Sequence, residues 1–239
     1  MTADGLERLR GGRFPELPLH CGRSEDAGIL DAEEWRDWTR QPTTPDQLRI
    51  EDYLDLFDLR GRRLLHVGLG NSGFAQRFHR RAAEIVGTTL VPAECRHAEE
   101  LGLPNYRPRL HNKYLAAGAP EGPFDFIADN NPTTFSCCLS HMRAMLEFYA
   151  GALAPGGQIV TDRVGLAWVS AGPGQNPRWA FDFEDLAAVA PLAGLQAYRF
   201  DGDTYLLARS QPERPGPLSG LARFLRSARR KLRRALRKT

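Results

Sequence analysis

A short apolar run that leads into a glycine-rich turn is the feature that most constrains the fold of this chain. Residues 63–67 read RLLHV and continue directly into GLGNSG at 68–73, after which residues 74–83 favour a helix. A second apolar run, residues 84–90, follows at once. Strand, glycine turn, helix and strand in this order form a βαβ unit, whose parallel strands are covered by helices on both faces. The sequence therefore predicts an α/β fold.

The rest of the chain continues the alternation of helix and strand. A helix is predicted from Thr44 to Phe57, before the glycine turn. Later segments are predicted as a strand at 124–128, a helix at 136–153, a strand at 158–161, a helix at 183–189 and two final strands at 195–200 and 204–208. Asp-Gly between the last two runs is a hairpin signal. We expect a doubly wound, mostly parallel sheet that ends in an antiparallel hairpin.

The 239 residues suit one domain with short appendages. Glycine and proline interrupt the first 43 residues, and one short helix is expected there around Trp35 and Trp38. We divide the chain into an N-terminal arm or lid (1–43), a domain (44–210), a proline-rich linker (211–217) and a basic amphipathic tail (218–239).

The glycine turn has a structural and a functional interpretation. Gly68 permits a sharp turn, Gly70 lets a ligand approach the backbone, and Gly73 permits close packing of the helix on the strand. Such a turn can serve packing alone. However, this turn follows the first strand of an α/β alternation, and ligands bind α/β sheets at that edge.

Four segments resemble the class I S-adenosylmethionine (SAM)-dependent methyltransferases. They are HVGLGNSG at 66–73, IVGTTL at 85–90, FDFIADNNP at 124–132 and LAPGGQIV at 153–160. The last segment, followed by a terminal hairpin, is the most diagnostic. The resemblance implies a Rossmann-like, seven-stranded sheet, SAM as cofactor and methyl transfer as the activity.

The resemblance also implies the residues that contact the cofactor. The predicted cofactor contacts are His66, Gly68, Gly70, Asn71, Gly73, Thr89, Asp129 and Asn130. The family usually has acids at the positions of His66 and Thr89. Glu94 lies five residues beyond Thr89, but Pro92 intervenes, so we do not expect Glu94 to replace the missing acid.

Asp129 and His141 are the candidate catalytic residues. A base is required only when the acceptor is a poorly nucleophilic hydroxyl. His141 lies near the start of a predicted helix, where its side chain is suited to point into a cleft at the ligand-binding edge of the sheet. A capping or packing role is the alternative for His141, as a core position is for His66. The cleft is expected to be closed by Trp35, Trp38 or Trp168, and residues 111–114 are expected to be solvated at the surface.

The cysteines do not indicate a metal site. The four cysteines, at 21, 95, 137 and 138, form no C-x-x-C spacing, so neither a zinc knuckle nor a disulfide framework is expected. The first 15 residues carry charges where a secretory signal has an apolar core, and no apolar run reaches the length of a membrane span. We therefore expect the chain in the cytoplasm.

The C-terminal tail, residues 218–239, is strongly basic, whereas the rest of the chain is acidic. Residues 218–239 contain nine basic residues and no acid, and subtracting them from the net charge of +3 leaves −6 for the rest. Leucines and alanines recur there at helical spacing, which predicts an amphipathic helix on the inner face of an anionic membrane. A tail that binds nucleic acid and a solvated tail are the alternatives.

The functional prediction is methyl transfer from SAM to a small-molecule or saccharide-type acceptor, with peripheral attachment to the membrane. Three alternatives remain open. The chain is otherwise a nucleic-acid methyltransferase, a non-catalytic binding protein that keeps the fold, or a nicotinamide enzyme, although the acid that a nicotinamide enzyme needs is replaced by Thr89.

Overall fold

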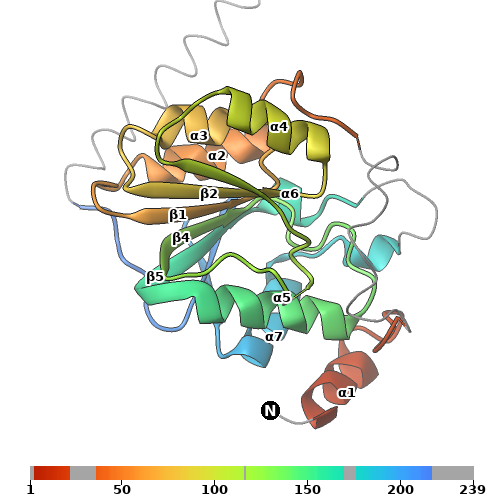
Figure 1. Ribbon diagram of the computed structural model, residues 1–239. Coiled ribbons are helices and arrows are strands. Elements are labelled where there is room, and N and C mark those ends of the chain that lie inside the picture. The colour runs from red at the N-terminus through yellow and green to blue at the C-terminus, as the bar shows by residue number, and fades with distance from the viewer. Residues whose placement is uncertain (1–2, 22–35, 116, 170–175, 217–239) are drawn as a thin grey trace, which may run out of the picture.

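The computed structural model describes residues 3–21, 36–115, 117–169 and 176–216. Its centre is a seven-stranded sheet in the order β3-β2-β1-β4-β5-β7-β6 (Figure 1). The strands are β1 (Arg63–Val67), β2 (Glu84–Thr89), β3 (Tyr106–Leu110), β4 (Phe124–Asp129), β5 (Leu153–Asp162), β6 (Gln196–Arg199) and β7 (Thr204–Ala208). The first five strands are parallel, whereas β7 is antiparallel to both β5 and β6. The predicted mixed sheet with a terminal hairpin is confirmed.

Helices cover both faces of the sheet (Figure 1). On one face lie α2 (Pro45–Leu54), α3 (Gly73–Phe78) and α4 (Pro92–Glu100). On the other lie α5 (Leu139–Ala152) and α7 (Phe183–Val189), with α1 (Ala3–Gly12) beyond them. Short turns of helix are α6 (Arg163–Leu166), η2 (Pro177–Trp179) and η3 (Ala190–Ala193).

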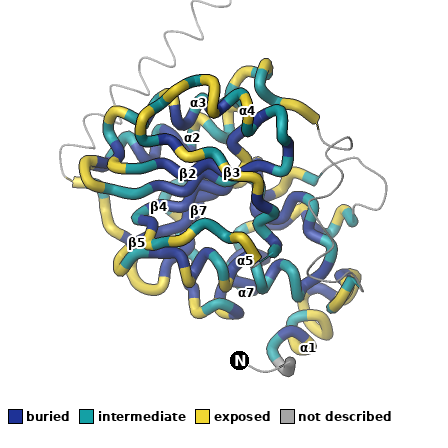
Figure 2. The backbone as a smooth tube through the Cα atoms, in the orientation of Figure 1, coloured by how far each residue is buried: buried dark blue, intermediate teal, exposed yellow. Residues whose placement is uncertain are grey.

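The alternation of side chains along β1 explains why both faces need a cover. Leu64 packs in the core formed with α2 and α3, while its neighbour Leu65 packs in the core formed with α5 and α7. Successive side chains of a strand point to opposite faces, so an apolar run such as this one is buried on both sides. The central strands β1, β2, β4 and β7 are accordingly buried along most of their length (Figure 2).

The order of the strands fixes the position of the ligand edge. The chain passes from β1 outward to β2 and β3 and then returns to place β4 on the other side of β1. Val67 pairs with Asp129, so β1 and β4 end side by side. The connections leave in opposite directions here, and open α/β sheets bind ligands at such a switch point.

Of the longer described helices, two have no counterpart in the sequence analysis, and the helix after the glycine turn is shorter than predicted. α1 is one of them, and the other, α4, begins at Pro92, which the sequence analysis interprets only as an interruption. Proline is well suited to the first turn of a helix, because the N–H that it lacks has no partner within the helix there. The predicted tail helix over 218–239 and Trp35 lie outside the described residues.

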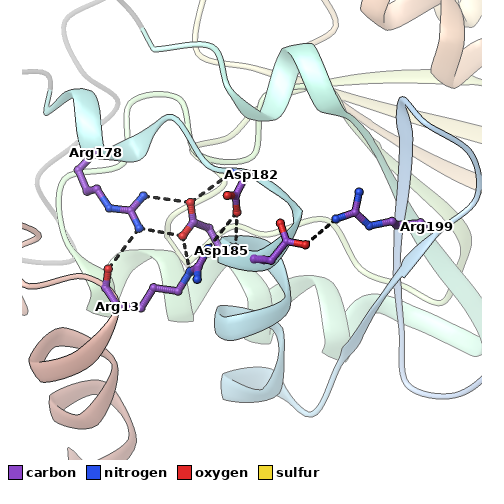
Figure 3. Close-up of polar contacts among 6 residues, drawn as sticks. Arg13, Arg178, Asp182, Asp185 and Arg199 are labelled. Atoms are coloured by element: carbon purple, nitrogen blue, oxygen red, sulfur yellow. Dashed lines mark hydrogen bonds and ion pairs between the residues drawn. The ribbon is translucent and has the colours of Figure 1, made fainter.

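Residues 13–21, here called the N-terminal strap, pack into the core. Phe14 is fully buried and stacks on Phe181 with ring centroids 5.1 Å apart. Arg13 and Arg178 both bind the buried carboxylate of Asp185, at 2.5 Å and 2.8 Å (Figure 3). Part of the segment predicted as an arm or lid is therefore anchored to α7 and η2.

Within the described ranges, no helix combines the length and the apolar character that a membrane crossing requires.

Candidate functional site

Bare backbone marks the end of β1. Gly68 has φ of +80° and Gly70 of +47°, and the N–H groups of Gly68 and Leu69 both donate to the carbonyl of Thr88. A Cβ placed on Gly68 meets no atom of the described residues within 4 Å. The turn therefore leaves open space beside its first glycine, where a ligand can approach the main chain closely.

The other end of the glycine turn is covered by residues 36–43, here called the covering segment. A Cβ on Gly73 would lie 2.6 Å from the Thr43 hydroxyl, so this position has no room for a side chain. The Asn71 amide donates to the carbonyl of Gln41 at 2.7 Å and to Thr43 Oγ1 at 3.2 Å. Trp38 Cβ lies 3.6 Å from the Cβ position of Gly70. Asn71 and Gly73 thus hold the covering segment in place.

A buried carboxylate lies at the end of β2, contrary to our prediction. Glu94 Oε2 accepts a 2.5 Å hydrogen bond from the Thr89 hydroxyl, and Oε1 accepts one from the Trp38 N–H at 3.0 Å. The prediction that Pro92 keeps Glu94 away is wrong, because Pro92 begins α4 and places Glu94 in its first turn. Burial raises the pKa of Glu94, against the hydrogen bond from Thr89.

The end of β4 is densely hydrogen-bonded. Asp129 is buried, and its carboxylate accepts from Lys113 Nζ at 3.0 and 3.2 Å, from Tyr149 Oη at 2.6 Å and from the Asn131 N–H at 3.1 Å. The Lys113 side chain is only 13% exposed, and its burial lowers its pKa while Asp129 raises it. Both oxygens of Asp129 are therefore engaged in fixing the loop after β4.

Asn130 keeps one polar atom without a partner. Its Nδ2 donates to Asp46 at 2.5 Å, while its buried Oδ1 accepts no hydrogen bond from any described residue. A side chain at Gly165 would clash with Asn130. From the same helix as Asp46, Arg49 binds Asp162 at the end of β5 with two bonds of 2.6 and 2.8 Å. The start of α2 is thus fixed at the ligand edge, next to an unused acceptor.

The third strand ends in residues that we expected to be solvated, and that expectation is wrong. His111 and Tyr114 are buried. The His111 ring contacts Phe148 of α5 edge to face at 5.5 Å, and burial lowers its pKa to about 4. Tyr114 donates to the carbonyls of Pro132 and Thr134. Tyr114 therefore supports the loop after β4, His111 packs on α5, and both side chains are largely removed from solvent.

His66 lies inside the fold. Its ring stacks on Phe74 with centroids 4.3 Å apart, and within the described part of the chain neither ring nitrogen has a hydrogen-bond partner. Burial lowers the pKa of His66 to about 3, so the ring is neutral at ordinary pH. This placement matches the core alternative rather than a polar contact with a ligand.

His141 faces sulfur atoms. It lies in the first turn of α5, and its Nδ1 is 3.4 Å from Cys21 Sγ, 3.1 Å from Cys137 Sγ and 3.2 Å from Cys138 Sγ. The Cys137 thiol and the His141 N–H hold the pKa of Cys138 below its ordinary value, against its burial. None of the hydrogen bonds described for Asp129 comes from His141, so the structure does not join the two candidate catalytic residues.

The sequence contained a signal for this grouping that we missed. Cys137, Cys138 and His141 follow a C-C-x-x-H pattern, which places all three on one side of a helix start. Cys21 comes from a segment more than 100 residues earlier, so spacing rules do not detect it.

Aromatic side chains lie near the same edge. Trp168, just after α6, is 41% exposed, and its ring meets Phe135 edge to face with centroids 6.3 Å apart. Thr134 Oγ1 donates to the Trp168 carbonyl at 3.0 Å, which ties this segment to the loop after β4.

Solved structures of methyltransferases share this architecture. A TehB-like SAM-dependent methyltransferase from Corynebacterium glutamicum matches with a TM-score of 0.52 at 18% identity, over 75% of this chain and 96% of that one. The N-methyltransferase NodS from Bradyrhizobium japonicum matches with 0.51 at 16% identity, over 70% and 96%. A SAM-dependent methyltransferase from Clostridium acetobutylicum gives 0.53 at 13% identity, over 76% and 93%.

Comparison at the level of sequence gives no match. No protein-family model and no curated protein matches the chain. The structural likeness nevertheless extends over most of this chain and nearly all of each compared chain. The chain has the Rossmann-like fold of the SAM-dependent methyltransferases.

Proposed function

We propose that this protein is a SAM-dependent methyltransferase that acts on a small molecule. The observation that carries the proposal is the open space over Gly68. Asn130, just after β4, adds a buried Oδ1 that has no hydrogen-bond partner among the described residues. Both lie where β1 and β4 end side by side, at the switch point of the sheet. Bare backbone beside an unused buried acceptor is suited to a ligand with its own donors.

The residues present fit SAM. An amino acid joined to a nucleoside needs backbone that it can approach closely and acceptors for its ammonium and hydroxyl groups. Gly68 supplies the backbone, Asn130 Oδ1 an acceptor, and Glu94 with Thr89 a carboxylate and hydroxyl at the end of β2. In this proposal Glu94 takes the role of the acid that the family has at the position of Thr89.

The protein's contribution to the reaction is alignment and exclusion of water. SAM supplies a methyl group that its sulfonium already activates. The covering segment lies over Gly70 and Asn71, and so shields this part of the site from solvent. Alignment of two bound reactants replaces a bimolecular encounter, which can lower the barrier by about 7–11 kcal/mol.

The role of Asp129 follows from its hydrogen bonds. A general base must accept a proton from the acceptor, but both oxygens of Asp129 already accept bonds from Lys113, Tyr149 and the loop backbone. Burial keeps the Tyr149 proton in place by raising its pKa. We therefore assign Asp129 to positioning of the loop that faces the acceptor, and catalysis by Asp129 or His141 as a base stays a prediction.

The acceptor is proposed to bind against the aromatic pair at the same edge. Exposed Trp168 and its neighbour Phe135 offer an apolar surface, and Thr134 fixes it to the loop after β4. A small molecule with one apolar face suits this surface, and a saccharide-type acceptor presents such a face through its ring C–H groups.

Calorimetry on the full chain tests the cofactor. SAM and S-adenosylhomocysteine are each titrated into the protein, with ATP and NAD as control ligands that share the adenosine. We expect SAM and S-adenosylhomocysteine each to bind with a stoichiometry of one per chain, at the same site, and NAD to bind more weakly or not at all. If millimolar SAM gives no heat and NAD binds, the proposal is wrong.

The membrane part of the proposal concerns residues 218–239, which lie outside the described structure. Their nine basic residues and leucine stripe are suited to an anionic surface. We expect the full chain to co-sediment with vesicles of phosphatidylserine and phosphatidylcholine. A chain that ends at residue 217 should not bind these vesicles, and the full chain should not bind vesicles of phosphatidylcholine alone. Salt-dependent retention on duplex DNA or RNA without vesicle binding would favour the nucleic-acid alternative.

A further inference from the structure

Three thiols and one imidazole converge at the start of α5. We call this group the thiol–imidazole cluster; it consists of Cys21, Cys137, Cys138 and His141. The four ligand atoms lie within 4.8 Å of one another, and each sulfur is 3.1 to 3.4 Å from the same imidazole nitrogen. All three cysteines are free thiols, and Cys138 is buried.

Hydrogen bonds alone do not account for this arrangement. His141 Nδ1 carries either one proton or one lone pair, so it makes one hydrogen bond along its ring plane. Three sulfur atoms share that single nitrogen at hydrogen-bond distance. At least two of the three contacts are therefore not well-directed hydrogen bonds, whichever tautomer is present. A shared cation at the centre satisfies all four groups at once.

We propose that the thiol–imidazole cluster binds one Zn²⁺ ion. Tetrahedral Zn²⁺ has Zn–S bonds of about 2.3 Å and Zn–N bonds of about 2.0 Å, which place sulfur and nitrogen about 3.5 Å apart. The sulfur-to-nitrogen distances of 3.1 to 3.4 Å differ from that by a few tenths of an ångström. Three thiolates and an imidazole without a carboxylate are donors that favour zinc over magnesium or calcium.

The local structure holds the four ligands in position. Cys138 is the N-cap of α5, and its sulfur accepts from the His141 N–H at 3.5 Å. The N-terminal strap supplies Cys21, and its carbonyls at Pro18 and Leu19 accept the N–H groups of Leu139 and Ser140 at 3.0 and 3.1 Å. The positive end of a 14-residue helix also favours the thiolate form.

The donor count indicates a structural metal. Four protein ligands close a tetrahedral site and leave no position for substrate or water. The ion would link the N-terminal strap to α5, the helix whose Tyr149 donates to Asp129 at the candidate active site. Binding of a structural metal is coupled to folding, so zinc is expected to stabilise the strap in its docked position. This inference is independent of the proposed methyl transfer.

Metal analysis of the untagged full chain is the first test. Protein purified without chelators is analysed by inductively coupled plasma mass spectrometry, and metal-free protein is titrated with Zn²⁺ against a chromophoric chelator. We expect one zinc per chain and, with Co²⁺ in its place, the absorption of a tetrahedral thiolate site. An absence of Zn²⁺ and Co²⁺ binding by the reduced wild-type protein overturns the proposal, as does a native disulfide between Cys21 and either neighbouring cysteine.

Matched variants identify the ligands. Cys21→Ser and His141→Ala are each expected to lower zinc affinity more than 100-fold, beyond the roughly 10- to 100-fold cost of losing an outer-shell partner. His141→Cys restores a fourth donor and is expected to retain one zinc, which separates lost ligation from lost folding. Cys95→Ser is the control, because Cys95 is a free thiol outside the cluster. Unchanged affinity in Cys21→Ser contradicts the assigned ligand set.

Discussion

The ends of β1 and β4 are neighbours in the sheet but are built in opposite ways. β1 leads into glycine backbone with open space over Gly68. β4 ends in Asp129, whose carboxylate accepts hydrogen bonds from Lys113 and Tyr149. The first is suited to receive a ligand, since nothing of the described protein has to move. The second is suited to hold a loop in one geometry. One edge of the sheet therefore combines an open surface with a fixed frame.

The two strand ends differ in what they contribute: the end of β1 gives a ligand access to the backbone, and the end of β4 stabilises a loop. Glycine at a positive φ weakens the local chain but creates access, while a buried ion pair needs every hydrogen bond to offset its desolvation. Changes at Asp129 should therefore act mainly on stability, and changes at Gly68 mainly on binding. The first two predictions below test that division, and two further predictions with smaller effects follow.

The largest effect is expected from Asp129→Ala. The change leaves the buried ammonium of Lys113 without its counter-ion, and breaking a buried pair from one side costs about 3–5 kcal/mol. Urea unfolding measures the loss. The double variant Asp129→Leu with Lys113→Met removes both charges and should recover part of the stability. A cost below about 1 kcal/mol for Asp129→Ala would show that the pair is solvated.

Gly68→Val should remove cofactor binding. The new side chain occupies the open space over the turn, so we expect SAM affinity to fall at least about 100-fold, or about 2.7 kcal/mol. Gly61→Val is the matched control, because Gly61 also has positive φ (+76°) and open space around its Cβ position, but precedes β1. Both variants carry a similar backbone strain of about 1–2 kcal/mol. Equal losses of SAM affinity in the two would contradict a ligand site at Gly68.

His66→Leu is expected to stabilise the protein by about 1–3 kcal/mol at neutral pH. The change removes two buried ring nitrogens that have no hydrogen-bond partner among the described residues. The folded pKa of His66 is lowered to about 3 from an ordinary 6.5, so its unfolded form takes up a proton first. The contribution of His66 to the free energy of unfolding is therefore present above pH 6.5 and is lost as the pH falls towards 3.

The variant should therefore show a shallower loss of unfolding free energy than the wild type as the pH falls from 6.5 towards 3. Its SAM affinity is measured in parallel as the control. A large loss of SAM affinity in His66→Leu would support the predicted cofactor contact and contradict a packing role.

The smallest effect is expected from Glu94→Gln. Burial raises the folded pKa of Glu94, so this group contributes stability at pH values below its unfolded pKa and loses it as the pH rises through the folded pKa. The glutamine amide does not titrate, and its oxygen still accepts from the Trp38 N–H. The variant should gain stability relative to the wild type as the pH rises through the folded pKa of Glu94. Parallel pH profiles would show that Glu94 is not desolvated.

The succession of strands and helices along the chain was predictable because local patterns encode it. Apolar runs such as residues 63–67 and 124–128, the glycine turn between them and the Asp-Gly hairpin signal each depend on near neighbours in sequence. α7 matches its prediction at Phe183–Val189, where Asp182 and Asp185 form a capping box. α4 was missed because Pro92 was interpreted as an interruption rather than as a first turn.

The sequence by itself determined the α/β alternation, the glycine turn and the fold that they imply. Only the tertiary structure decided that Glu94 faces the end of β2, that Lys113 is buried against Asp129 and that Cys21 meets His141. The physical reason is distance along the chain. Periodicity and turn chemistry act within a few residues, whereas burial, ion pairing and metal ligation depend on which segments the sheet brings together.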